Sequence, residues 1–342
     1  MTHPFPRHRR LPLLAAALVA APLLTGCGLF TDPDLVVYSG RNETLVGPVI
    51  ERFEQESGLD VEVRYGDTAE LAAQLLEEGD ASSADVFFSQ DAGALGALTA
   101  EGLLAELPAE TLGRVPAQFA SEEGTWVGIT GRSRVVAYDP DAVALADLPD
   151  DVLEFAEPQW AGRVGIAPTN ASFQSFVTAL RLTEGEDVAR TYLEDLQDND
   201  VQLFDNNLAA LDALEAGEVD VALINHYYVT ARRAELGAEN VRTQLKFLPP
   251  GTAGALVNVA GVGLLADAED PEGHGQEFLD FLLSDQTQTE FVERTGEYPL
   301  TGVPGPEGVP SLEELGAGAG VQLSELASLD VTLDLLTEVG LI

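Results

Sequence analysis

The sequence predicts an α/β protein whose two lobes close like a clam-shell over a cleft. The first observation is a regular alternation of short apolar strands with amphipathic helices, which indicates mostly parallel sheets covered by helices. The second is length, because about 315 residues follow the N-terminal leader, too many for one typical core. The third is a pair of strand segments, 133–138 and 255–265, placed to join the lobes as a two-strand hinge.

Three strand–helix units open the first lobe. Each unit pairs a short apolar run with a segment whose apolar residues recur every three or four positions. Consecutive units of this kind form parallel strands, because the helix carries the chain back across one face of the sheet. The expected strands are 35–38, 61–65 and 84–89, and the expected helices are 44–56, 68–78 and 91–101.

The same pattern resumes after the first hinge segment. The expected strands are 163–167, 201–204 and 219–224, and the expected helices are 172–182, 208–216 and 273–283. We assign residues 34–133 and 256–300 to lobe 1 and residues 134–255 to lobe 2. Residues 301–342 are expected to form a Pro/Gly-rich linker followed by acidic C-terminal helices.

The first 26 residues have the composition of a secretion signal. Three arginines precede an apolar run over residues 11–24, which is too short to span a bilayer in the mature protein. The run ends in LTGC, which resembles the lipoprotein box whose cysteine, here Cys27, is lipidated. We expect residues 1–26 to be a signal peptide and residues 27–33 a tether. The body would then be lipid-anchored at the extracellular face of the cytoplasmic membrane, or periplasmic in a Gram-negative cell.

Composition excludes several classes of function. A formal charge of −41 argues against nucleic acid or anionic lipid as a partner, so membrane contact is expected through the lipid alone. The protein is also expected to be a monomer. Cys27 is the only cysteine, and His226 and His274 are the only histidines after the leader, which argues against zinc and copper sites. No G-x-S-x-G, Walker or HExxH motif occurs, so we expect no enzyme.

Two adjacent phenols follow a predicted buried strand. Tyr227 and Tyr228 come just after strand 219–224, at a strand-to-helix turn where both side chains can reach one cleft. A free phenol has a pKa near ~10, and a hard trivalent cation displaces such protons. Phenolate oxygen is an iron ligand. The alternative is that the phenols pack on the core or form the aromatic wall of a cleft.

Short polar residues precede several predicted helices. They are Asn42, Asp91, Asn170, Ser172 and Asn207. Each can serve only as a helix N-cap. Several helix N-termini that converge on one cleft also make an anion site, however. Arg41 could contact the same anion or be an exposed surface arginine.

These segments together resemble the periplasmic ferric-ion-binding proteins of iron ABC importers, within the transferrin-like, type II group of bacterial solute-binding proteins. The resemblance covers about residues 35–342. It depends on VYSGRNE (37–43), ADVFFSQD (84–91), GRSRVVAYDP (131–140), GRVGIAPTNASF (162–173), ALINHYY (222–228), GALVNVAGVGLL (254–265) and EYPL (297–300). It implies a type II periplasmic-binding-protein clam-shell that carries ferric ion, or a ferric chelate, to a permease driven by an ATPase.

The resemblance also implies a set of binding residues. In this family the tyrosines of an I-N-x-Y-Y motif bind Fe³⁺ as phenolates, which corresponds to Tyr227 and Tyr228. A synergistic anion, phosphate or carbonate, occupies the helix N-termini. The implied anion contacts are Asn170, Ala171, Ser172, Asn207 and Asn225, with Arg41 as a further candidate.

Two customary ligands of the family are replaced here by neutral residues. Asn42 stands where a histidine is usual and Gln90 where a glutamate is usual, so both are weak candidates as metal ligands. Asp91, one residue further on, is our first candidate for the missing carboxylate. The alternatives are Glu43, Tyr65, water or a chelating anion such as citrate.

A third tyrosine, which carbonate-type members use, is missing here, and Phe173 stands at roughly its position. Another kind of ligand stays open, namely a small organic or phosphorylated anion, which the Asn and Ser residues with Gln90 and Asn42 would suit. The two tyrosines would then be aromatic walls. A lipoprotein that signals by partner contact also stays open.

Overall fold

The computed structural model describes residue 1 and residues 32–270, 272–317 and 321–342. Cys27, most of the tether and all of the predicted signal peptide except residue 1 lie outside the described residues. The strands are β1 (Leu35–Ser39), β2 (Val61–Tyr65), β3 (Val86–Ser89), β4 (Trp126–Tyr138), β5 (Val164–Ile166), β6 (Gln202–Leu203), β7 (Val221–Asn225), β8 (Gln244–Lys246), β9 (Val257–Leu264) and β10 (Tyr298–Pro299). The α-helices are α1 (Glu43–Ser57), α2 (Thr68–Glu78), α3 (Ala92–Ala100), α4 (Ala109–Leu112), α5 (Ala171–Glu184), α6 (Glu186–Asp198), α7 (Asn207–Ala216), α8 (Tyr227–Leu236), α9 (His274–Leu282), α10 (Asp285–Thr295) and α11 (Leu329–Glu338).

The strands form a mixed sheet in the order β2-β1-β3-β9-β4-β7-β5-β6, with β8 and β10 also paired to β4. The outer pairs are parallel, as the strand–helix alternation predicts: β1 with β2 and β3, and β5 with β6 and β7. Every pair that involves β4 or β9 is antiparallel. The centre of the sheet therefore differs from its flanks.

Strand β4 belongs to both halves of this sheet. It pairs with β9 from Trp126 to Ser133 and with β7 from Arg134 to Tyr138. The strand begins at Trp126, well before the predicted start at Ser133. The prediction missed this first part because Gly128 and Gly131 weaken the strand signal in the sequence. A Cβ on Gly128 would lie 2.7 Å from the Leu300 Cδ1, so close packing requires the glycine.

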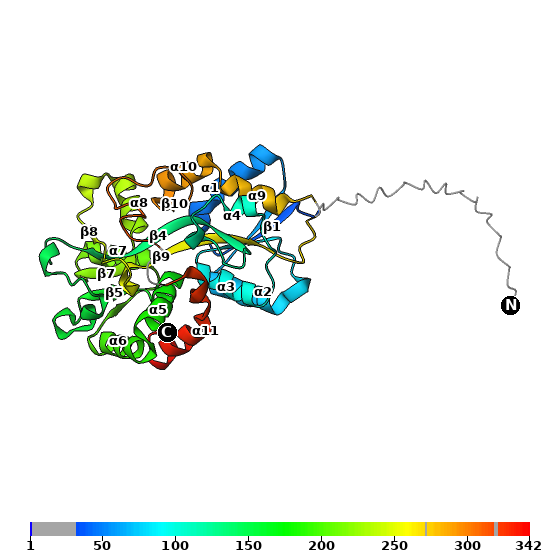
Figure 1. The fold of residues 1–342 in the computed structure, drawn as a ribbon. Helices are drawn as coiled ribbons and strands as arrows, with labels where there is room; N and C mark the ends of the chain where they lie inside the picture. Colours follow the sequence, from blue (N-terminus) through cyan, green and yellow to red (C-terminus); the bar gives the residue numbers. More distant parts are fainter. Residues whose placement is uncertain (2–31, 271, 318–320) are drawn as a thin grey trace. The chain divides into compact units, whose positions relative to one another are not determined.

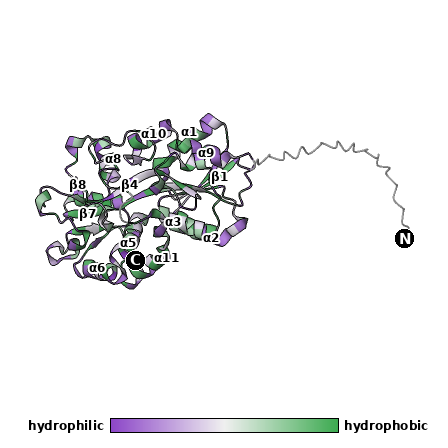
Figure 2. Cartoon of the chain, viewed as in Figure 1, coloured by the Kyte–Doolittle hydropathy of each residue, from purple (hydrophilic) through white to green (hydrophobic). Residues whose placement is uncertain are grey.

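The helices cover the sheet in two groups (Figure 1). In that view α1, α9 and α10 lie on one side of β4 and β9, and α2, α3, α5, α6 and α11 lie on the other. Figure 2 shows hydrophilic and hydrophobic residues along the same outer helices, as expected where one face of a helix is buried. None of the helices in the described ranges is both long and apolar enough to cross a membrane.

Helices α4, α6 and α10 were absent from the sequence prediction. Helix α6 buries Ala189, Tyr192, Leu193 and Leu196, a spacing that does indicate an amphipathic helix and could have revealed it. Helix α10 is mostly polar and starts at the Ser284 cap, so its hydrophobic signal is weak.

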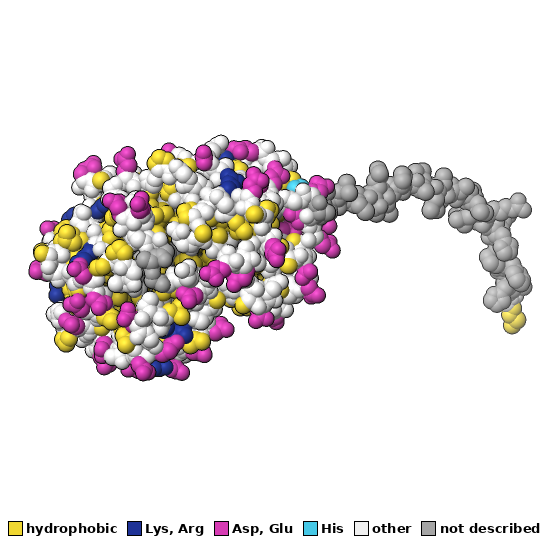
Figure 3. Space-filling view, in the orientation of Figure 1, with side chains coloured by type: hydrophobic (Ala, Val, Ile, Leu, Met, Phe, Trp, Pro, Cys, Tyr) yellow, Lys and Arg dark blue, Asp and Glu magenta, His cyan; other side chains and the backbone are white. Residues whose placement is uncertain are grey.

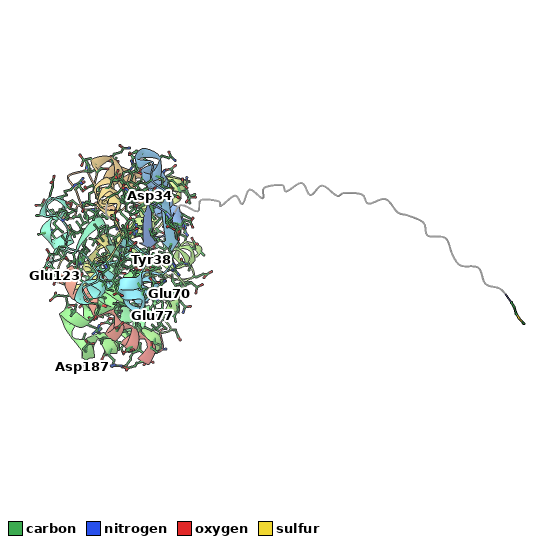
Figure 4. All side chains as sticks on the ribbon, turned by 90° about the vertical axis from the view of Figure 1, so that its right-hand side faces the viewer. Asp34, Tyr38, Glu70, Glu77, Glu123 and Asp187 are labelled. Carbon is green, nitrogen blue, oxygen red and sulfur yellow. The ribbon has the colours of Figure 1, made fainter. Side chains whose placement is uncertain are left out.

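The acidic charge of the chain lies on its surface. Figure 3 shows Asp and Glu side chains spread over the visible face, with few Lys or Arg among them. Glu70 and Glu77 of α2, together with Glu123 and Asp187, are exposed (Figure 4). Solvated acids of this kind keep a protein soluble and give no binding site by themselves.

Gly296 ends α10 where the chain passes close to α8. Its φ is 69°, and an added Cβ would overlap the Thr230 hydroxyl and lie 3.1 Å from the Thr230 Cβ. We expect Gly296→Ala to lower the free energy of unfolding by roughly 2–3 kcal/mol, from backbone strain together with overpacking. Chemical denaturation measures this value.

Gly58 provides the matched control. It ends α1 with a φ of 80°, and an added Cβ would meet nothing within 4 Å. We expect Gly58→Ala to cost only about 1 kcal/mol, from the backbone alone. Equal losses in the two variants would contradict a tight contact between Gly296 and α8.

Candidate metal centre

A cavity of about 460 Å³ lies where several strand-to-helix junctions meet. The residues just before α1, α3, α5 and α7 and the first turn of α8 contribute to its lining. Ligand sites of α/β folds form at this edge, beyond the carboxyl ends of the strands. The lining residues are Arg41, Asn42, Thr44, Leu45, Gln90, Asn170, Asn206, Leu208, Tyr227, Tyr228, Ala231, Arg232, Glu235 and Thr295.

The two tyrosines lie together in this cavity. Strand β7 ends at Asn225, and α8 begins at Tyr227, so the chain changes direction between the strand and the phenols. The rings of Tyr227 and Tyr228 stack with centroids 4.2 Å apart and planes 30° apart. Tyr227 is buried and Tyr228 half-buried. The helical turn therefore brings both side chains to one place, as the sequence predicted.

The surroundings of Tyr227 favour the neutral phenol. Burial raises the pKa of Tyr227 well above its ordinary value, and the neighbouring Tyr228 adds to that rise. Arg41 and Arg132 act in the opposite direction. At neutral pH the phenol keeps its proton, so a strong cation is needed to displace it.

Two buried arginines and one glutamate lie beside Tyr227. Arg41 donates to the Glu297 carboxylate at 2.6 Å, and both side chains are buried. Burial opposes ionisation of Glu297, but Arg41 and Arg132 hold its pKa below the usual value. Arg132 donates to the Gln90 carbonyl, and its Nε and Nη1 have no partner among the described residues. Arg41 is thus an ion-paired residue that also lines the cavity.

The roles of Arg132 and Glu297 were missed in the sequence. Both lie in segments quoted for the family resemblance, but neither segment indicates that the two side chains approach Tyr227. Their positions depend on the pairing of β4 with β9 and β10, which brings residues far apart in sequence together.

The three candidate replacement ligands have different surroundings. Asn42 and Gln90 line the cavity, and the Asn42 side chain also accepts from the Thr44 N–H at 2.9 Å. Asp91 is buried and caps α3, accepting from the Ala94 N–H at 3.2 Å. The structure does not bring Asp91 to the cavity with the tyrosines, nor does it bring Glu43 or Tyr65 there.

Most of the predicted anion contacts lie together. The Asn170 side chain accepts from the Ser172 hydroxyl at 2.7 Å and from the Asn207 amide at 3.2 Å. Asn207 also donates to the Ser172 hydroxyl at 3.0 Å, and Ala171 opens α5 beside them. Two buried amide atoms, the Asn207 Oδ1 and the Asn225 Nδ2, have no partner in the described part of the chain. We call Asn170, Ala171, Ser172, Asn207 and Asn225 the anion cradle.

His226 connects the tyrosine turn to β4. Its Nδ1 accepts from the Ser133 N–H at 3.2 Å, and its Nε2 donates to the Gly296 carbonyl at 3.0 Å. The ring stacks on Tyr298 with centroids 4.6 Å apart. Burial lowers the pKa of His226 to about 4, so the imidazole is neutral at physiological pH. Both ring nitrogens are therefore engaged away from the cavity.

The chemistry of this centre is that of oxygen donors. Across the described ranges, no group of three or more His, Cys, Asp or Glu side chains is arranged to hold a metal. The cavity offers two phenols, neutral amides, a helix N-terminus and one carboxylate, that of Glu235, beside the cations Arg41 and Arg232. That set can take a hard cation together with an anion.

The fold and this cavity define a class: two-lobe α/β proteins that bind a small ligand in the cleft at the ends of their strands. Residues 35–296 match the family model for bacterial extracellular solute-binding proteins, and the chain belongs to that family. This membership confirms the prediction of a binding protein rather than an enzyme.

Several relatives are named for ferric iron. The chain is 37% identical over 294 residues to the major ferric iron-binding protein of Neisseria meningitidis, covering 85% of this chain and 86% of the relative. Iron-bound HitA from Pseudomonas aeruginosa has a TM-score of 0.84 at 33% identity, covering 90% of this chain and 99% of that one. A Trichodesmium protein in complex with iron and citrate has a TM-score of 0.73 at 27% identity, covering 90% and 99%. The predicted fold class and family resemblance are confirmed.

Proposed function

We propose that this protein captures ferric ion outside the cytoplasm and delivers it to an ABC importer. The observation that carries the proposal is the tyrosine pair. Two stacked phenols line the cavity at the start of α8, and neither hydroxyl hydrogen-bonds to any described residue. Both oxygens are thus available to a ligand, and phenolate binds Fe³⁺. Relatives named for ferric iron support the same reading.

In this proposal Tyr227 and Tyr228 bind the ion as phenolates. A phosphate or carbonate ion in the anion cradle completes part of the coordination shell, with Arg41 beside it. Asn42 and Gln90 line the cavity as neutral amides and contribute at most weak oxygen ligands or hold water. The two phenolates then carry more of the binding than in a site that also has a histidine and a glutamate.

Asp91 remains our proposed source of the missing negative charge. It is fully buried, it has no ion-pair partner among the described residues, and it follows cavity-lining Gln90 directly. Burial raises the pKa of Asp91, and Arg132 opposes this rise. We expect Asp91→Asn to weaken ferric binding roughly 10- to 100-fold while the cap is kept, because asparagine caps helices as well as aspartate does.

The matched control is Asp67→Asn at the cap of α2. The Asp67 side chain accepts from the Ala69 N–H at 2.9 Å in an exposed position. We expect this variant to bind ferric ion like the parent protein in a competition titration with a chelator. Unchanged affinity in Asp91→Asn as well would remove Asp91 from the site.

Delivery would follow closure of the two lobes around metal and anion, with the closed form recognised by a permease and its ATPase. We propose residues 34–133 plus 256–300 as lobe 1, residues 134–255 as lobe 2 and residues 301–342 as a C-terminal segment. The change of partner in β4 between Ser133 and Arg134 supports a hinge at that point. We further propose that a monomer is held at the membrane by lipid on Cys27.

The direct test is ferric loading of the purified protein. Addition of ferric salt with phosphate or bicarbonate is expected to produce a visible phenolate-to-iron charge-transfer band with one ion per chain. A protein that stays colourless with both anions would contradict the iron–phenolate site.

The cavity volume supports a second candidate ligand, a carboxylated or phosphorylated molecule. At about 460 Å³ it is larger than one metal ion and one inorganic anion need, and its amides suit a carboxylated or phosphorylated ligand. The relative that holds iron with citrate shows one such combination for that protein. Thermal-shift screening of ferric salt, ferric citrate and the organic anions alone separates the free ion, the chelate and the anion as ligands.

A further inference from the structure

Arg134 is a buried cation that lacks a carboxylate partner. Its side chain is 3% exposed, and none of the ion pairs formed by the described residues includes it. Burial lowers the pKa of Arg134 to about 10, so the guanidinium is still charged at neutral pH. Its Nε has no hydrogen-bond partner within the described ranges.

Two other buried arginines are ion-paired, whereas Arg132 lies near the carboxylates of Glu297 and Asp91 without an ion pair among the described residues. Arg41 pairs with Glu297 at 2.6 Å, and Arg181 pairs with Glu186 at 2.7 Å. A buried charge without such a partner is destabilising, because it loses the solvation that water provides. Arg134 donates to carbonyl oxygens and lies over the rings of Phe173 and Phe176, and the neutral Tyr192 phenol is also near it.

The position of Arg134 links it to the anion cradle. Its Nη1 donates to the Ser172 carbonyl at 3.4 Å, while the Ser172 hydroxyl bonds Asn170 and Asn207. Across the sheet, Arg134 is the register partner of Asn225, whose Nδ2 has no partner in the described residues. The positive end of α5 lies at the same place.

We infer that Arg134 is a specificity-determining residue of the anion subsite, whose buried positive charge is compensated by the bound anion and selects a phosphate-class dianion over a monoanion. This inference rests on the proposed anion role of the cradle. Arg134 acts through space and through Ser172, because it is not among the residues that line the cavity. The attraction is only weakly screened in a buried setting and grows with the charge of the anion.

The test uses metal-free protein and inorganic phosphate at constant ionic strength. For the parent protein we expect phosphate to raise the Tm, and bicarbonate to raise it less. Arg134→Met should match or exceed the parent Tm without phosphate, because an unpaired buried charge is gone. It should also lose the phosphate shift, with a dissociation constant roughly tenfold higher or more. A lower Tm with an intact phosphate shift would overturn the inference.

Two further variants keep the result decisive. Arg134→Lys retains a positive charge and should keep part of the phosphate shift, so a lysine variant as unresponsive as the methionine variant would also overturn the inference. Arg181→Met removes a buried cation that has a carboxylate partner. Arg181 lies on α5, the helix whose N-terminus belongs to the anion cradle. It should lower the Tm and leave the phosphate shift intact.

Ferric loading in phosphate-free bicarbonate separates this inference from the proposed function. Colour without any phosphate shift in the parent protein would overturn the role of Arg134 and leave iron capture standing. A phosphate shift that depends on Arg134 without colour would support the anion subsite and contradict iron capture.

Discussion

Replacement of both Tyr227 and Tyr228 by phenylalanine is expected to abolish the ferric charge-transfer band and to weaken ferric binding by more than about 100-fold. Loss of an outer-shell partner alone costs metal sites roughly 10- to 100-fold, and here two direct ligands are removed. Each single variant should keep a weaker, shifted band. Because neither hydroxyl bonds to the described residues, the variants should fold with little change in Tm.

Tyr192→Phe is the matched control for this experiment. Tyr192 is buried outside the cavity, and its hydroxyl has no hydrogen-bond partner in the described part of the chain. We expect this variant to keep the full band and the parent affinity. Full ferric affinity in the double variant, measured by chelator competition, would show that the cation binds elsewhere.

Acidification is expected to release ferric ion steeply, by about 100-fold in apparent affinity per pH unit. The factor follows because two phenol protons leave when one ion binds, so protons and iron compete for the same oxygens. The raised pKa of Tyr227 sets the direction of the pH dependence of ferric affinity, since the neutral phenol is favoured at all pH values below that pKa. Affinity therefore rises with pH through the physiological range, and loss of the band on a pH titration measures it.

Unfolding must be separated from release in the same titration. Burial lowers the pKa of His226 from its ordinary value of 6.5 to about 4, so the neutral imidazole is favoured in the folded state. That stabilisation is complete above pH 6.5 and is lost as the pH falls towards 4, by up to roughly 3 kcal/mol. Circular dichroism should show intact fold at the pH where most of the colour has gone. A slope near tenfold per pH unit would indicate one phenolate ligand rather than two.

The outer parts of the fold were predictable because their signals are local. Helix α1 buries Val46, Val49, Ile50 and Phe53, the same face that the apolar period indicates. Strand β4 was predicted only from Ser133 onwards, because Gly128 and Gly131 interrupt the apolar pattern, although Gly128 is needed where the strand packs against Leu300 and the Phe119 carbonyl. In the sequence, a glycine that is needed for packing looks like the end of a strand.

The tyrosine pair and the anion cradle were predictable for a related reason. Residues at strand-to-helix junctions meet at one edge in any fold of this type, so Tyr227, Tyr228 and Asn170 could be placed together without coordinates. The burial and hydrogen-bond partners of Asp91 and Arg134 could not be predicted in this way. A capping aspartate and a cavity-facing aspartate look the same in sequence, and an arginine in a strand carries no sign that it will be buried without a carboxylate partner.

By itself the sequence determined the strand–helix alternation, the junction edge and the adjacent phenols, since each depends on residues that are near one another along the chain. Only the tertiary structure decided which charges surround them. Glu297 meets Arg41 across 256 positions, and Arg134 meets Ser172 across 38. Such pairings depend on the order and register of the strands, and the electrostatic energy of a buried group depends on every neighbour that those strands bring to it.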